Sequence, residues 1–103
     1  MKALPADMRR YHLWVSEQPC ASCGDSYVQV AHYHGIRKGS FGGGMGKKSH
    51  HLMVAPLCQG CHAEYDSGRW QCGDDPKGYE SEIMLHYIAV TIIAGYEAGV
   101  IKI

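Results

Sequence analysis

The chain has 103 residues, of which 46% are hydrophobic and 19% are charged. This length provides for one hydrophobic core, and the hydrophobic share excludes a disordered chain, so we expect a single domain over residues 1–103. Ten Lys and Arg residues balance ten Asp and Glu residues. Net charge alone therefore predicts no polyanion as a partner.

The N-terminal residues 1–7 have no apolar stretch behind their charges. Their composition predicts no signal peptide and a reducing, cytoplasmic location, in which disulfides are not expected. The longest apolar stretch, Ile83–Tyr96, has 14 residues, whereas a helix that spans a bilayer needs about 20. We therefore expect no membrane segment.

The first predicted element is a short helix over residues 7–15. Apolar side chains recur there at helical spacing and share one face, namely Met8, Tyr11, Trp14 and Val15. Pro19 cannot continue the helix, so the helix should end before it.

Two short strands are predicted in the middle of the chain. Tyr27–His34 is rich in β-branched and aromatic residues, and strand alternation would send His32 and His34 to one face. Gly35–Gly46 contains six glycines, which is typical of an exposed loop. His51–Ala55 is the second predicted strand, and it leads into a pair of cysteines.

Two further helices are predicted. One should begin at the second cysteine pair and carry residues 62–66, and the longer one should cover residues 79–96. The longer helix has a broad apolar face formed by Ile83, Met84, Tyr87, Ile88, Thr91 and Ile92. We expect this face to pack on the rest of the domain, with a homodimer interface as the alternative.

Four cysteines form two C-x-x-C pairs, Cys20 with Cys23 and Cys58 with Cys61. Structural zinc prefers four such thiolates in a tetrahedron, so we predict one structural zinc ion. The 34 residues between the pairs exceed the spacing of a compact zinc ribbon and favour a treble-clef arrangement. Chance pairing and a redox motif are the alternatives, and the redox motif lacks its β-α-β context. The fifth cysteine, Cys72, is expected to be a partly exposed thiol without a functional role.

The charges are unevenly distributed along the chain. No acidic residue occurs between Asp25 and Glu64, whereas five of the seven histidines lie there. The same stretch holds four cations around the glycine-rich loop, namely Arg37, Lys38, Lys47 and Lys48. Cations and exposed backbone N–H groups can hold DNA phosphates without reading sequence, so these four are candidate DNA-binding residues. A solvated basic loop is the alternative.

Several short motifs occur in an order and spacing that match a known family. They are Ala31-His32, Gly43–Lys48, His51-Leu52 and Pro56–His62. Through them, residues 20–66 resemble the HNH-type endonucleases of phages and prophages. The resemblance implies an α+β fold of the ββα-metal, treble-clef type. In that fold, a strand hairpin and a helix hold one divalent cation over the scissile phosphate.

The resemblance also implies roles for individual residues. His32 matches the general base of the family, and an imidazole with a pKa of about 6.5 can take a proton from water at neutral pH. His62 matches the metal ligand on the helix. His51 stands where the family carries Asn or Asp, and it is the second candidate ligand of the same cation. Asp66, four residues after His62, is a further candidate ligand. Packed or solvated positions are the structural alternatives for these side chains.

One position departs from the family pattern. Many HNH enzymes carry Asp or His as a ligand directly before the base, but this chain carries Ala31, so His34 is the candidate substitute ligand. The sequence predicts a phage-encoded, metal-dependent DNA endonuclease that acts in recombination or DNA processing. Its cofactors would be a structural Zn²⁺ and a catalytic Mg²⁺, Mn²⁺, Ni²⁺ or Zn²⁺. The alternative is a non-catalytic treble-clef module that binds nucleic acid or a recombination protein.

Overall fold

The computed structural model describes residues 5–35, 38–42, 50–67 and 76–101. Within these ranges, the chain forms three α-helices, one 3-10 helix and a two-stranded antiparallel sheet, which confirms the α+β class. The elements in chain order are α1 (Ala6–Ser16), β1 (Val28–His32), η1 (Lys38–Phe41), β2 (Val54–Cys58), α2 (Gln59–Asp66) and α3 (Pro76–Glu97).

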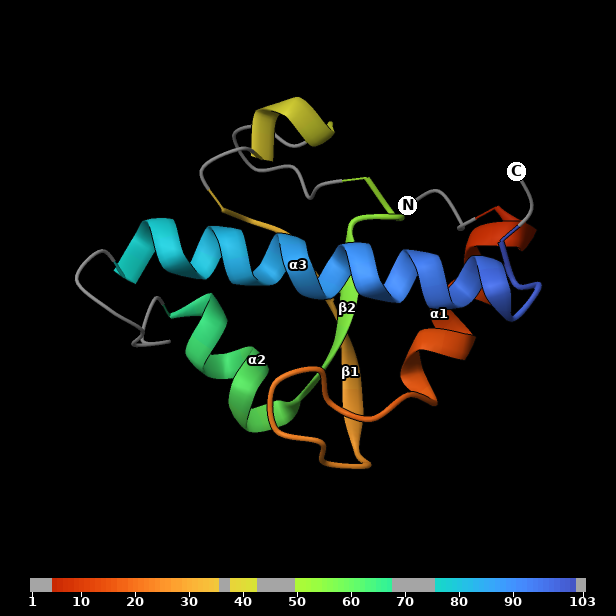
Figure 1. The fold of residues 1–103 in the computed structure, drawn as a ribbon, viewed down its shortest axis with the longest axis horizontal. Helices are drawn as coiled ribbons and strands as arrows, with labels where there is room; N and C mark the ends of the chain where they lie inside the picture. The colour runs from red at the N-terminus through yellow and green to blue at the C-terminus, as the bar shows by residue number, and fades with distance from the viewer. Residues whose placement is uncertain (1–4, 36–37, 43–49, 68–75, 102–103) are drawn as a thin grey trace.

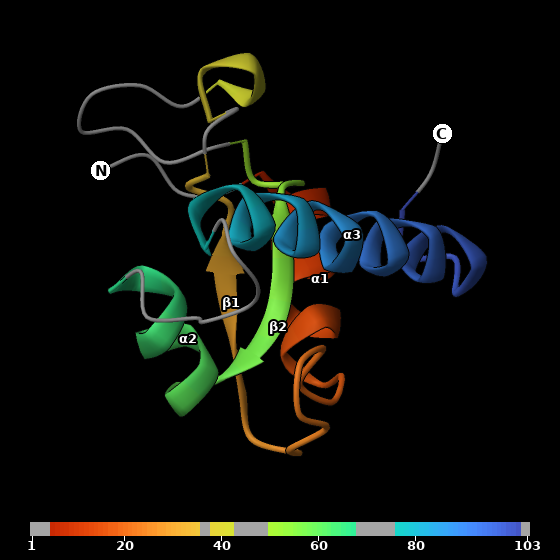
Figure 2. The same cartoon turned by 60° about the vertical axis from the view of Figure 1, so that its left-hand side comes forward.

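The two strands form a central hairpin that is surrounded by the three α-helices. In Figure 1, α3 crosses in front of the strands, while α2 and α1 lie on either side of them. Helix α3 contacts β2, α1 contacts both strands and α3, and α2 contacts both strands. In the turned view of Figure 2, the two strands run side by side between α2 and α1. Among the described residues, no helix combines the length and apolar character that crossing a bilayer requires.

The predicted leading helix is confirmed as α1, which extends the expected range by one residue at each end. Tyr11 and Val15 are buried in a small core together with Val54, the first residue of β2. Gly95 of α3 lies against the Tyr11 ring. A Cβ atom at Gly95 would come within 2.9 Å of Tyr11 Cε1, so glycine permits the close approach of the two helices.

The sequence pattern predicted the second strand too early in the chain. β2 begins at Val54 and runs to Cys58, whereas His51–Ala55 was expected. The segment before β2 is a turn instead, because the Met53 N–H donates to the His50 carbonyl oxygen (2.9 Å). His51 therefore lies in the turn that enters β2.

The first strand ends at His32, so the expected alternation does not reach His34. After the strand, the His34 N–H donates to the hydroxyl group of Tyr65 on α2 (3.0 Å) and not to the neighbouring strand. The prediction that His32 and His34 share one strand face is therefore wrong. Their side chains belong to two separate polar clusters.

The residues of β2 are buried without alternation from Val54 to Leu57, because helices cover the strand. Pro56 is tolerated there because its carbonyl oxygen points away from β1 and accepts a hydrogen bond from the Ala21 N–H (2.8 Å). The N and C=O of one strand residue point the same way, so the missing Pro56 N–H costs no hydrogen bond to β1. This bond also fixes the first cysteine loop to the free edge of β2.

The larger core lies between the hairpin, α2 and α3. It is formed by Cys20, Ala31, Tyr33, Ala55, Leu57, Tyr65, Met84 and Ile88. The predicted apolar face of the long helix is confirmed, since Met84, Ile88 and Thr91 are buried. Helix α3 starts at Pro76, three residues before the expected start, and proline is favourable as the first helical residue.

Two isoleucines of α3 provide a matched test of this packing. Ile88 is 1% exposed in the core, whereas Ile93 is 58% exposed. We expect Ile88→Ala to lower the free energy of unfolding by about 2–5 kcal/mol, through lost burial and a cavity. Ile93→Ala should change it by less than about 0.5 kcal/mol. Urea unfolding of both variants checks this, and equal effects would contradict the placement of the helix.

The buried hydroxyl group of Tyr11 provides a second test. It has no hydrogen-bond partner within the described ranges, and burial raises the pKa of Tyr11 from 10.0 to about 12. The fold therefore favours the neutral phenol, and this stabilisation is complete below pH 10 and lost as the pH rises from 10 towards about 12. We expect Tyr11→Phe to be neutral or stabilising at pH 7 and to remove this alkaline loss. The midpoints of urea unfolding between pH 10 and about 12, measured for Tyr11→Phe and for the unchanged chain, test this prediction.

Candidate metal centres

The four cysteines of the two C-x-x-C pairs lie together at one end of the hairpin. Their sulfur atoms are all within 4.8 Å of one another, and Cys23 Sγ lies 3.6 Å from Cys58 Sγ. None of the four forms a disulfide. A tetrahedral zinc site with Zn–S bonds of about 2.3 Å separates its sulfurs by about 3.8 Å. The cluster can therefore hold a metal ion such as zinc.

The two pairs share one local geometry. The Cys23 N–H donates to Cys20 Sγ and the Cys61 N–H donates to Cys58 Sγ, each at 3.5 Å. Gly24 follows the first pair with φ of +82°, which closes a tight turn that glycine adopts without strain. The second pair spans the junction of β2 and α2, where Cys58 caps the helix N-terminus.

The electrostatics of the cluster favour a bound cation. Burial disfavours the Cys20 thiolate, but hydrogen bonds from backbone N–H groups outweigh it and lower the pKa of Cys20 to about 7. Burial and the neighbouring Cys58 sulfur raise the pKa of Cys61. Four thiolates this close repel one another, so full deprotonation of the set requires a metal ion, which itself promotes it.

A second group consists of His12, His32 and His51, which we call the histidine triad. One nitrogen of each ring lies within 4.8 Å of the other two. The three ring centroids are 5.7, 5.8 and 5.7 Å apart, and the ring planes meet at 75°, 76° and 77°. Each pair of rings thus meets edge to face, and no two of the rings stack.

Three different elements carry the triad. His12 belongs to α1, His32 is the last residue of β1, and His51 lies in the turn before β2. His12 Nε2 donates to the carbonyl oxygen of His51 (2.8 Å), which ties the helix to this turn. His32 Nε2 lies 3.5 Å from His51 Nδ1.

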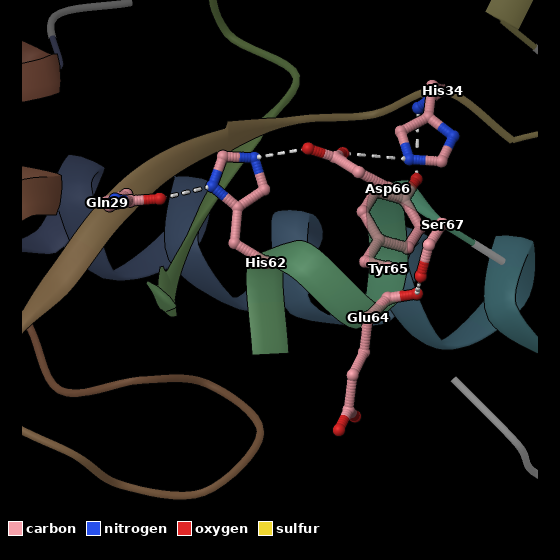
Figure 3. A network of polar contacts seen from close by, with 7 residues as sticks. All are labelled: Gln29, His34, His62, Glu64, Tyr65, Asp66 and Ser67. Carbon is pink, nitrogen blue, oxygen red and sulfur yellow. Dashed lines mark hydrogen bonds and ion pairs between the residues drawn. The ribbon is translucent and has the colours of Figure 1, made fainter. Parts of the chain in front are cut away.

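A third group surrounds Asp66 at the end of α2, and we call it the Asp66 cluster (Figure 3). His34 Nε2 lies 3.2 Å from Asp66 Oδ1, and His62 Nε2 lies 3.3 Å from Asp66 Oδ2. His62 Nδ1 donates to Gln29 Oε1 of β1 (2.7 Å). The His34 ring stacks on Tyr65 with centroids 3.9 Å apart.

The hydrogen bonds of His62 restrict its protonation. The Gln29 oxygen only accepts, so His62 Nδ1 carries a proton. His62 Nε2 then faces the Asp66 carboxylate either with a second proton or with a lone pair directed at a shared cation. A carboxylate oxygen with imidazole nitrogens suits a divalent cation.

The structure divides the predicted site residues between two groups. His62, Asp66 and His34 meet in the Asp66 cluster, whereas His32 and His51 meet in the triad. Sequence reasoning missed His12, which the fold brings across from α1, and Gln29. The side chains of Arg37, Lys38, Lys47 and Lys48, and all of Cys72, lie outside the described part of the structure.

The fold and these clusters define a small α+β protein with a cysteine site that can hold a metal ion such as zinc. The family described as "protein of unknown function (DUF968)" matches residues 2–95, and the chain belongs to it. The chain is similar to the uncharacterized protein YdfU of Escherichia coli (strain K12), with 34% identity over 86 residues. This match covers 84% of the chain and 23% of the relative, so the chain spans about a quarter of that relative. No solved structure matches.

The cysteine cluster predicts a measurable metal content. We expect about one zinc ion per purified chain, and we expect Cys61→Ser to lower this content and the midpoint of thermal unfolding, because the tetrahedral set loses a ligand. Cys72→Ser is the matched control, since this cysteine belongs to neither pair. Elemental analysis with thermal unfolding checks both variants. A chain that stays folded without metal, or equal losses in both variants, would contradict the site.

Proposed function

We propose that the chain is a metal-dependent DNA endonuclease of the HNH type. The observation that carries the proposal is the succession of β1, β2 and α2, with His32 at the end of the first strand and His62 on the helix. The second cysteine pair lies where strand and helix meet. This order agrees with the ββα-metal arrangement that the sequence resemblance implies.

The cysteine cluster would hold a structural zinc ion in a treble-clef arrangement. The first pair lies in the loop before β1, and the second pair lies at the start of α2. One ion bound by both pairs would fix α2 relative to the hairpin. Its role is geometric, because four cysteine ligands leave no open position for a substrate.

His32 is the general base of this proposal. Its ring is half-buried and lies 3.5 Å from His51 Nδ1, so His51 helps to fix the orientation of the ring. A neutral imidazole can accept a proton from water at physiological pH, which would generate the hydroxide that attacks phosphorus.

The Asp66 cluster would bind the catalytic cation. Its Asp66 carboxylate is 56% exposed, which leaves the cation open to a DNA phosphate, and the flanking side chains of His34 and His62 are 37% and 23% exposed. A cation such as Mg²⁺ or Mn²⁺ there would stabilise charge on the pentacovalent phosphorus and on the departing 3′ oxygen.

DNA is the partner expected for the cations of the glycine-rich loop. Arg37, Lys38, Lys47 and Lys48 would contact the phosphate backbone and hold the strand without sequence preference. Such contacts weaken as salt rises, because counterions compete for the phosphates. The reaction would belong to phage recombination or DNA processing, with a recombination protein or a second copy of the chain as further partners.

A second candidate function is a non-catalytic treble-clef module that binds nucleic acid or a recombination protein. Ala31 favours it. Its side chain is fully buried in the core beside Tyr33 and Leu57, so this position supplies no ligand next to His32. The zinc frame and basic loop would then serve attachment alone.

Nicking of supercoiled plasmid DNA in Mg²⁺, Mn²⁺ or Ni²⁺ tests the catalytic proposal. We expect the unchanged chain to nick, and His32→Ala to be slower by about 100-fold or more through loss of the base. His86→Ala is the matched control, because this histidine is exposed on α3 and belongs to neither histidine cluster.

The outcomes separate the two candidate functions. Nicking by His32→Ala at the unchanged rate would remove His32 from the mechanism. Absence of nicking by any variant, together with salt-sensitive retention of DNA, would favour the binding module.

A further inference from the structure

We infer that the histidine triad is a second metal site, which binds a transition-metal ion such as Ni²⁺, Co²⁺ or Zn²⁺ through three imidazoles. This site is separate from the cysteine cluster and from the Asp66 cluster. One of its members, His12, belongs to α1. The inference concerns binding and does not depend on nuclease activity.

The spacing of the nitrogens supports a shared ion. Imidazole ligands bind zinc at about 2.0–2.1 Å, so two of them in a tetrahedron are separated by about 3.4 Å. The contact between His32 Nε2 and His51 Nδ1 is 3.5 Å. The third nitrogen, from His12, lies within 4.8 Å of both. A small contraction of the triad would complete three bonds to one ion.

The orientation of the rings supports it as well. A metal ion lies in the plane of each imidazole that binds it, so three ligands that converge on one ion cannot stack face to face. The triad avoids stacking, with all three pairs of ring planes between 75° and 77°. Three nearly equal centroid distances place a single point at similar distance from every ring.

The chemistry of the donors selects the class of ion. Three neutral imidazoles suit Zn²⁺, Ni²⁺, Co²⁺ and Cu²⁺, whereas Mg²⁺ and Ca²⁺ prefer oxygen ligands. No carboxylate belongs to the group among the described residues, which disfavours the hard cations. Three protein ligands leave a further coordination position for water or a ligand oxygen, as in zinc enzymes with three histidines.

The surrounding fold holds the triad in place. Tyr11, which precedes His12 in α1, is buried in the small core with Val15 and Val54. Val54 is also the residue of β2 that pairs with His32. The bond from His12 Nε2 to the His51 carbonyl oxygen also holds α1 to the turn of His51. Because Nε2 donates its proton there, an ion bound through Nε2 would replace this bond, whereas an ion bound through Nδ1 would leave it in place. The site is thus largely formed before an ion arrives, which lowers the entropic cost of binding.

Titration of the zinc-loaded chain with NiCl₂ tests the inference. Calorimetry should show about one Ni²⁺ bound per chain, while elemental analysis shows that the zinc of the cysteine cluster is retained. In ¹⁵N NMR spectra, paramagnetic Ni²⁺ should broaden the signals of His12, His32 and His51 before those of His62 and His86. This measurement needs no variant.

Variants then identify the ligands. His12→Gln should weaken Ni²⁺ binding by about tenfold or more, since loss of a group that merely supports a ligand already costs that much. His51→Gln should act similarly, whereas His86→Ala should bind as the unchanged chain does. Zinc content and amide NMR spectra establish that each variant is folded, and where one is not, the NMR result on the unchanged chain decides.

Three results would overturn the inference. The first is no Ni²⁺ binding beyond the cysteine cluster, and the second is unchanged affinity in folded His12→Gln. The third is broadening centred on His34 and His62, which would place the ion at the Asp66 cluster instead. None of these results bears on nicking in Mg²⁺, so failure of the metal site and failure of the nuclease proposal are distinguishable.

Discussion

The meeting of four cysteines at one end of the hairpin is the constraint on which the arrangement of this protein depends. Their sulfurs converge within 4.8 Å although the two pairs come from distant parts of the chain. A cation bound there would compensate the charge of their thiolates and would join the loop before β1 to the start of α2. The Ala21 N–H also binds the Pro56 carbonyl oxygen of β2, so the first loop is held to the strand by the main chain as well. Together these ties would make the hairpin and α2 one frame, on which the histidines depend for their positions.

Much of the fold could be predicted because it follows from local patterns. The helical periodicity around Tyr11 and Ile88 correctly indicated α1 and α3, and the C-x-x-C spacing correctly indicated the cysteine cluster. The start of β2 was missed because β propensity cannot reveal that the His50 carbonyl oxygen closes a turn with Met53. Strand alternation likewise placed His34 on the same face as His32. It could not reveal that the His34 N–H donates to the Tyr65 hydroxyl group beyond the end of the strand.

The composition of the histidine groups could not be predicted for a different reason. His12 and His51 are joined by a contact across 39 positions, and no periodicity or motif records such a pairing. The only local signal is that His12 follows the buried Tyr11, which puts it at the margin of the packed face of α1. Gln29 is likewise explained only by its contact with His62. Residue types indicated metal chemistry, whereas tertiary contacts decided which residues share a site.

The two histidine groups differ in the kind of cation that each favours, and this difference bears on His32. The Asp66 cluster offers one carboxylate beside two imidazoles, whereas the triad offers imidazoles alone, so only the Asp66 cluster supplies the kind of oxygen ligand that Mg²⁺ prefers. In the proposed mechanism with Mg²⁺ as the only cation, His32 would bind no metal and would act as the base. With Ni²⁺ or Zn²⁺ in the triad, His32 would instead be a ligand, and water bound to that ion would be an alternative source of hydroxide. The identity of the available ion would therefore decide whether His32 takes a proton or holds a metal.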